Sequence, residues 1–204
     1  MELILASASP RRAEILRDAG LRFAIARANV IESRRPGETA RAMTRRLARA
    51  KAQGVVRKLA NQPREAIVIG ADTIVEVNGK LLGKPQSRAA ARRMLGKLAG
   101  KTHRVLTSVA AIRLPDRVEQ LATESTRVRF AKLRADEIAA YVATGEPLDK
   151  AGAYAVQGIG GRFIERIDGC YFNVVGLPLA RLYRMLTYLG WQPAAANRRG
   201  KAAR

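Results

Sequence analysis

The sequence is poor in the residues that form disulfide and zinc sites. Its 204 residues include one cysteine, Cys170, and one histidine, His103, which excludes a disulfide framework and a cysteine–histidine zinc site. We expect Cys170 to be a small buried apolar residue. No apolar run approaches the ~18 residues of a membrane span, and the first residues predict a strand rather than a signal peptide. We therefore expect a cytoplasmic protein without a membrane partner.

Acidic residues are also scarce. There are 17 Asp and Glu residues against 38 Lys and Arg, which gives a net charge of +21, and such an excess raises nucleic acid as a partner. However, the cations are spread along the predicted helices, and aromatic residues make up only 5% of the chain, too few for a base-stacking surface. We favour an arginine-rich solvated surface over dedicated nucleic-acid binding, which stays open through that basic surface.

Hydrophobic patterning predicts one α/β domain over residues 1–190 and a flexible basic tail over residues 191–204. Residues 3–6 predict a strand, and Ser9, Pro10 and Gly20 mark the start and end of the next helix. Asn78-Gly79 predicts a tight hairpin after a strand over residues 66–77. Further helices are expected over residues 39–60, 87–100, 135–145 and 179–190. We expect a strand-like run over 23–31 and an antiparallel pair of strands over 104–114 and 122–130. Residues 152–179 predict short strands with glycine turns. Crossover and hairpin connections together predict a mixed sheet, in two lobes with a central cleft.

The turn "SASPRR" at residues 7–12 is the first candidate site. A helix N-terminus offers unpaired N–H donors to an anion. Arg11 and Arg12 in the first turn oppose the helix dipole, and a polyphosphate would correct this mismatch. An ordinary Ser-Pro helix start with two surface arginines explains the pattern equally well.

Two other stretches carry candidate residues. Asp72 interrupts an apolar run, where a carboxylate needs a partner such as a metal, a lysine or a reacting group. Lys84 could return to the same end of the sheet; a structural Asp–Lys pair is the alternative. In "PLDKAGAYAVQGIGG", Gln157 stands among glycines, which suggests backbone shaped closely around a ligand or simply turns with positive φ. Glu32 is a further candidate acid for the cleft, or a surface salt-bridge residue.

Three motifs in this order are specific enough to suggest a family. "LILASASPRRAEIL", "GADTIVEVNGKLLGKP" and "EPLDKAGAYAVQGIGGRFIERIDGCYFNVVGLPL" resemble the Maf family of septum-formation-inhibitor-like nucleotide pyrophosphatases. The likeness runs from Leu3 to about Leu189. It implies a two-lobed fold of the inosine-triphosphate-pyrophosphatase type, a homodimer, and hydrolysis of a nucleoside triphosphate to the monophosphate and pyrophosphate with a divalent cation, Mg²⁺ or Mn²⁺.

The resemblance also implies roles for individual residues. Asp72 matches the family's proton acceptor, and the other polar positions of the cleft match Ser9, Arg11, Arg12, Glu32, Lys51 and Lys84. Our own hypothesis is that Glu32 and Asp72 hold the metal, and that phosphate is bound by Ser9, Arg11, Lys51 and Lys84. Ile31 and Ala50 stand where the family often has acids, and this departure bears on the affinity for metal.

Three positions separate the branches of the family. Arg12, Thr73 and Gln157 match the branch that hydrolyses dTTP and UTP, whereas the 7-methyl-guanosine triphosphate branch tends to have an aromatic residue, a glutamine and a glutamate there. A carboxamide can match the adjacent acceptor and donor of uracil and thymine, whereas a carboxylate suits guanine. We therefore predict a dTTP/UTP pyrophosphatase that serves in nucleotide-pool house-cleaning. A nucleotidyltransferase and a basic nucleic-acid-binding regulator of cell division remain as alternatives.

Overall fold

Within residues 1–60 and 64–193, which the computed structural model describes, seven strands form one mixed sheet, as predicted. The strands are β1 (Glu2–Leu5), β2 (Ala24–Ile25), β3 (Ala66–Val77), β4 (Lys80–Leu82), β5 (Thr102–Leu114), β6 (Glu119–Phe130) and β7 (Ile164–Asp168). They lie in the order β2-β1-β3-β5-β6-β7, with β4 paired to β3. β1 is parallel to β2 and β3, and the remaining pairs are antiparallel.

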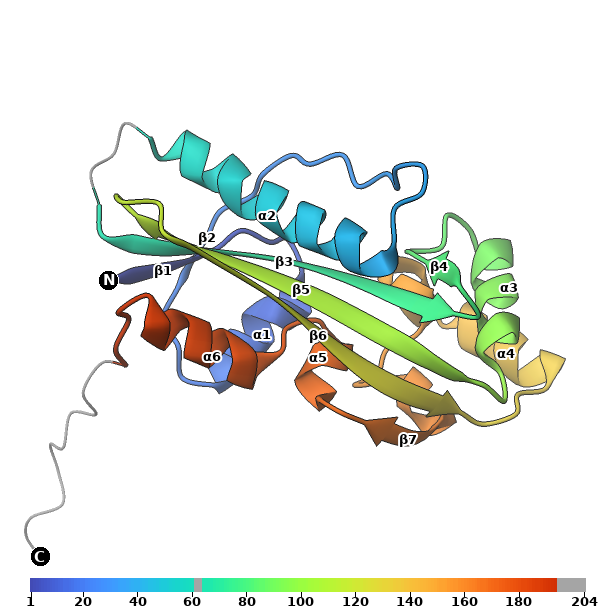
Figure 1. Ribbon diagram of the computed structural model, residues 1–204. Helices are drawn as coiled ribbons and strands as arrows, with labels where there is room; N and C mark the ends of the chain where they lie inside the picture. Colours follow the sequence, from blue (N-terminus) through green and yellow to red (C-terminus); the bar gives the residue numbers. More distant parts are fainter. Residues whose placement is uncertain (61–63, 194–204) are drawn as a thin grey trace, which may run out of the picture.

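Helices cover both faces of the sheet (Figure 1). They are α1 (Pro10–Asp18), α2 (Ala40–Lys58), α3 (Arg88–Leu98), α4 (Ala135–Ala143), α5 (Tyr171–Val175) and α6 (Leu179–Tyr188), with short 3-10 helices η1 (Glu146–Asp149), η2 (Ala151–Ala153) and η3 (Ile159–Phe163). α2 lies along one face, and α1 and α6 lie on the other. None of the helices in the described ranges is both long and apolar enough to cross a membrane.

Alternation along the central strands explains this layering, because successive side chains of a strand point to opposite faces. In β3, Ile67 and Ile69 pack in the core with α1 and α6. The neighbouring residues Ala66 and Val68 pack instead in the core with α2. One lobe is therefore a three-layer sandwich around one end of the long strands.

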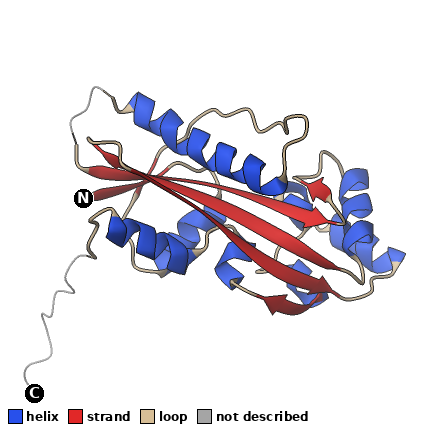
Figure 2. Ribbon diagram, in the orientation of Figure 1, coloured by secondary structure: helices blue, strands red, loops and turns tan. Residues whose placement is uncertain are grey.

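A second lobe surrounds the other end of the same strands. Val75, Val105 and Val128 pack there with residues of α3 and α4, among them Leu95 and Tyr141. β3, β5 and β6 run through both lobes without interruption (Figure 2). The two lobes expected from the sequence are thus built on one continuous sheet, and residues near the middle of β3 lie where the lobes meet.

Local signals in the sequence mark several element boundaries correctly. Ser9 is the N-cap of α1 and Pro10 its first residue. Asn78 and Gly79 have φ of 48° and 71° and connect β3 to β4, as the hairpin motif predicted.

Other expectations were wrong. The run over residues 23–31 contains only the two-residue strand β2, because its neighbour β1 ends at Leu5 and offers no further partner. Residues 152–179 contain one strand, β7, between short helices. Cys170 is half-buried rather than fully buried, because it follows Gly169 at the start of α5, outside the main core.

The end of the described chain packs against the first lobe. Trp191, the first residue of the expected basic tail, contacts the core that contains α1 and α6, and its ring lies 6.1 Å from that of Tyr183. Residues 194–204, which hold the cations of that tail, lie outside the described residues.

Candidate active site

A cavity opens along the edge of β3 between two of its strand partners. β1 pairs with β3 from Ala66 to Ile69, and β4 pairs with it from Val75 to Val77. The intervening stretch, which includes Asp72, lies at the carboxyl end of β1, where strand direction and order change along the sheet. Ligands of open α/β sheets commonly bind at such a switch point.

This cavity has a volume of about 640 Å³. All nine residues singled out from the sequence line it: Ser9, Arg11, Arg12, Glu32, Lys51, Asp72, Thr73, Lys84 and Gln157. They come from six separate parts of the chain, so the fold brings together motifs that are far apart in the sequence.

Asp72 and Lys51 form a buried ion pair in the cavity wall. The Lys51 ammonium donates to Asp72 Oδ1 at 2.7 Å and lies 2.6 Å from Glu32 Oε1. Asp72 is 6% exposed. Burial raises the pKa of Asp72, although Lys51 and Arg12 act in the opposite direction. The carboxylate is therefore a better proton acceptor than an exposed aspartate.

Glu32 is the more exposed of the two acids. Partial burial alone would raise the pKa of Glu32, but the hydrogen bond and charge of Lys51 outweigh it, together with the charges of Lys84 and Arg12, and hold that pKa below its usual value. Glu32 thus lines the cavity, as predicted, and it is at the same time an exposed salt-bridge residue, the alternative that the sequence left open.

Close packing of α2 on β3 places Lys51 above Asp72. Asp72 points to the α2 face of the sheet, the same face as Val68. Two residues before Asp72, a Cβ on Gly70 would lie 2.3 Å from the carbonyl oxygen of Ala48 in α2. Glycine at this position lets the helix lie against the strand, within reach of a lysine side chain.

Arg12 is a buried residue, not the surface arginine of the structural alternative. It is 8% exposed. Its Nε donates to the carbonyl oxygen of Gly176 at 2.8 Å, Nη1 to Ser7 Oγ at 3.1 Å, and Nη2 to Thr73 Oγ1 at 3.0 Å. Gly176 has a φ of 129°, which side chains disfavour, and this backbone conformation turns its carbonyl toward the guanidinium.

Thr73 links Arg12 to the neighbouring strand β5. Its hydroxyl lies 2.9 Å from that of Thr107 on β5. Thr107 donates its proton to the carbonyl oxygen of Asn173 at 3.0 Å, so Thr73 is the donor to Thr107 and the acceptor from Arg12. Arg12 and Thr73, two of the predicted specificity positions, are therefore one hydrogen-bonded unit.

Further cations line the cavity. Arg11 lies 3.5 Å from Asp149, which also pairs with Lys150. Lys84 is exposed and follows the β3–β4 hairpin, as expected. Arg11, Lys84 and Lys150 come from three different segments, and together with Arg12 they make the cavity suitable for a polyanion.

A divalent cation would need ligands beyond the protein's own. No group of three or more His, Cys, Asp and Glu residues gathers within the described ranges. Glu32 and Asp72 nevertheless converge on one cation, the Lys51 ammonium. Mg²⁺ often takes one or two carboxylates and completes its shell with phosphate oxygens and water. The residues present fit a metal that is shared with a phosphate ligand.

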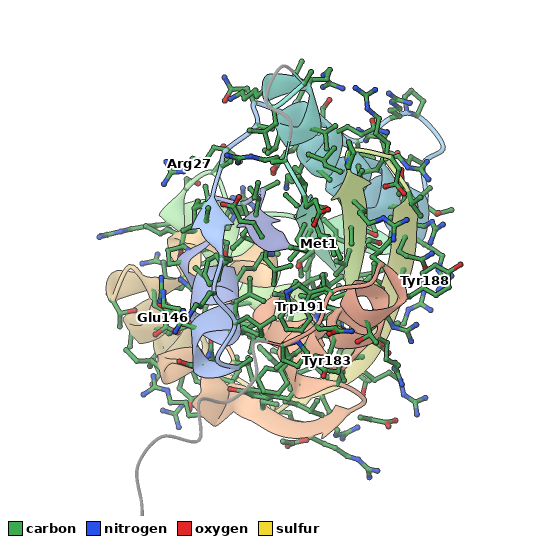
Figure 3. The ribbon with its side chains drawn as sticks, turned by 90° about the vertical axis from the view of Figure 1, so that its left-hand side faces the viewer. Met1, Arg27, Glu146, Tyr183, Tyr188 and Trp191 are labelled. Atoms are coloured by element: carbon green, nitrogen blue, oxygen red, sulfur yellow. The ribbon has the colours of Figure 1, made fainter. Side chains whose placement is uncertain are left out.

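Some residues that line the cavity were not predicted from the sequence. Arg27, Tyr154 and Ser7 line the cavity, and Figure 3 shows Arg27 on the same side of the molecule as Glu146. Arg27 follows β2 in a stretch predicted as strand, where one arginine among many carries no signal. Ser7 lies inside the "SASPRR" motif, and only its contact with Arg12 reveals its part.

Comparison with known sequences decides the family. A family model described as Maf-like protein matches residues 2–189. The chain belongs to the Maf family. A protein of Symbiobacterium thermophilum named dTTP/UTP pyrophosphatase is 49% identical over 190 residues, which cover 93% of this chain and 95% of that protein. A Pelotomaculum thermopropionicum protein of the same name is 50% identical over 190 residues, covering 93% and 97%.

Comparison with solved structures supports the fold of this Maf protein. The structure of the Staphylococcus aureus Ham1 protein matches 93% of this chain and 100% of its own with a TM-score of 0.51 at 17% sequence identity. This likeness confirms the inosine-triphosphate-pyrophosphatase type of fold that the sequence resemblance implied.

Proposed function

We propose that this Maf protein hydrolyses dTTP and UTP to the nucleoside monophosphate and pyrophosphate, as a nucleotide-pool house-cleaning enzyme. One observation carries the proposal: a buried carboxylate, Asp72, faces a cavity that cations line from several segments. The names of its relatives at 49% and 50% identity support the same activity.

The reaction would place a water molecule between Asp72 and the α-phosphorus. Asp72 accepts the proton of the water as its oxygen forms the new bond to phosphorus. The bond between the α-phosphorus and the bridging oxygen breaks, and pyrophosphate leaves with that oxygen. Lys51 donates a hydrogen bond to Asp72 at 2.7 Å and so fixes the orientation of the carboxylate.

The cations would stabilise the charge that grows on the phosphate oxygens. Arg11 and Lys84 line the cavity. The partner of Arg11, Asp149, has a side chain that is 62% exposed, so this surface ion pair would open at little cost as Arg11 turns toward a triphosphate. The α1 N-terminus at Ser9 adds backbone N–H donors. A divalent cation held by Glu32, Asp72 and the phosphates would, when bound, withdraw further charge from the phosphate oxygens.

Base selection would fall to Gln157, Arg12 and Thr73. Gln157 lines the cavity and is exposed. Its carboxamide can donate to the O4 of uracil or thymine and accept from N3–H. Arg12 and Thr73 form a hydrogen-bonded unit that would limit the position of the nucleotide. The homodimer and the cytoplasmic location stay predictions.

The deciding experiment measures pyrophosphate release from dTTP, UTP, CTP, GTP and 7-methyl-GTP with Mg²⁺ or Mn²⁺. A clear preference for dTTP and UTP is expected. Preference for a guanine nucleotide would retain the reaction and overturn the specificity. Release that requires a sugar phosphate would favour the nucleotidyltransferase, and salt-sensitive binding to DNA or RNA without hydrolysis would favour the regulator.

A further inference from the structure

Glu146 holds the loop that follows Gln157. Its Oε2 accepts a hydrogen bond from the backbone N–H of Ile159 at 2.9 Å. Its Oε1 accepts from the backbone N–H of Gly160 at 3.1 Å. Glu146 begins η1, a separate segment of the chain, so this one carboxylate fixes the backbone two and three residues after Gln157.

Tyr141 completes the attachment from the other side. It lies fully buried on α4 and donates its hydroxyl to Glu146 Oε1 at 2.7 Å. The same hydroxyl oxygen accepts from the backbone N–H of Ala155 at 3.3 Å. The backbone is therefore held two residues before Gln157 as well as after it.

The glycines around Gln157 make room for this pair. A Cβ on Gly158 would lie 2.4 Å from Glu146 Oε2, and one on Gly160 would lie 2.4 Å from the Tyr141 hydroxyl. Neither glycine has positive φ. The backbone at Gly158 and Gly160 is thus shaped closely around Glu146 and Tyr141, and neither glycine is required by a turn with positive φ.

The charge state of Glu146 suits it to hold the backbone that follows Gln157. Burial alone would raise the pKa of Glu146, but the hydrogen bonds from Tyr141, Gly160 and Ile159 outweigh it, and the net pKa is lowered. An ionised carboxylate accepts on both oxygens. The Gln157 side chain, in contrast, has no hydrogen bond to the described part of the chain, so only its backbone is held.

We propose that Glu146 and Tyr141 are positioning residues for base selection, acting by fixing the backbone of Gln157 beside the nucleotide base. This role rests on the proposed function. A carboxamide that reads two adjacent atoms of a base must be placed to a fraction of an ångström, and small displacements are costly.

The test compares Glu146→Gln and Tyr141→Phe with the wild-type protein. In Glu146→Gln, one of the two acceptor oxygens becomes an NH₂ group, which cannot accept from the backbone N–H of Ile159 or Gly160. In Tyr141→Phe, the hydroxyl that accepts from the backbone N–H of Ala155 is lost. We expect the ratio of kcat/KM for dTTP to that for CTP to fall about tenfold in each. Glu137→Gln is the matched control, because Glu137 accepts a backbone N–H at the opposite end of α4; its ratio should not change.

A Gln157→Ala background separates positioning from general stability. If Glu146 acts through Gln157, Glu146→Gln leaves the dTTP-to-CTP ratio of Gln157→Ala unchanged, because coupled residues are not additive. Loss of hydrogen-exchange protection at the Ile159 and Gly160 amides checks the attachment without an activity assay. An equal fall for all nucleotides, or an equal change in both backgrounds, overturns the inference while the proposed function stands. A wild-type protein that releases no pyrophosphate overturns both.

Discussion

The ammonium of Lys51 lies 2.7 Å from Oδ1 of Asp72, across the contact between α2 and β3. The two side chains are 12% and 9% exposed, so each is largely removed from water. A buried carboxylate of this kind is expensive to retain unless it is paired or used. We therefore derive from this ion pair one prediction for the activity and another for the stability of the protein.

Replacement of Asp72 by asparagine tests the proton acceptor. Asp72→Asn keeps the shape of the side chain and a hydrogen-bond acceptor, but its amide cannot take a proton from water. We expect kcat to fall about 10³-fold, while the dissociation constant for dTTP changes little. Steady-state kinetics and calorimetric titration measure the two quantities.

Asp116→Asn is the control for this substitution. Asp116 pairs with Arg113 at the β5–β6 turn, outside the cavity, and its loss should leave kcat unchanged. Near-normal turnover of Asp72→Asn would refute the assignment.

Removal of the other partner tests the buried pair. Lys51→Met keeps much of the side-chain volume but leaves Asp72 without its cation. We expect the free energy of unfolding to fall by about 3 kcal/mol, and the double variant Lys51→Met/Asp72→Asn to recover part of this loss because no buried charge remains. Urea denaturation monitored by circular dichroism gives these values.

Lys58→Met is the matched lysine variant. Lys58 is exposed and donates to the carbonyl oxygen of Arg27, so its replacement should change the free energy of unfolding by less than about 1 kcal/mol. If Lys51→Met proves as stable as Lys58→Met, the pair does not stabilise the fold.

A carboxylate at position 157 tests base recognition. Gln157→Glu replaces a donor and an acceptor by two acceptors, which suit guanine better than uracil or thymine. The preference for dTTP and UTP over GTP should fall by at least about tenfold in kcat/KM. Gln120→Glu on β6, outside the cavity, adds the same charge and should have no such effect. An unchanged substrate profile would rule out this role for Gln157.

The sequence predicts the helices and strands of the protein better than it predicts the side-chain contacts of the candidate site. The apolar, β-prone run over residues 66–77 gives β3, and Asn78-Gly79 gives the hairpin that returns Lys84 to the cavity. These signals are local. The run over 23–31 also reads locally as strand, yet it fails because a strand needs a neighbour and β1 ends too early.

The contacts of the site depend on residues far apart in the chain. Lys51 and Asp72 are separated by 21 positions, and only the family resemblance placed both in one cleft. Glu146 carries no pattern of its own. Its part follows from the three-dimensional approach of η1 to the loop after Gln157, which composition and periodicity do not encode.

His103 provides a stability prediction that is independent of the site chemistry. It is 1% exposed on β5, and its Nε2 lies 2.8 Å from the Tyr154 hydroxyl. Its Nδ1 has no hydrogen-bond partner among the described residues. Burial lowers the pKa of His103 to about 4, so the folded protein keeps this ring neutral at neutral pH.

Between about pH 6.5 and pH 4 the unfolded chain therefore binds a proton at His103 that the folded chain does not, and the free energy of unfolding falls as the pH drops through this window. We expect the wild-type protein to lose about 2 kcal/mol more than His103→Gln between pH 7 and pH 5. Urea titrations of both proteins at the two pH values measure this difference, because the other titratable groups are shared and cancel. Equal losses in the two proteins would mean that His103 titrates alike in the folded and unfolded chain, and its burial would then carry no penalty for charge.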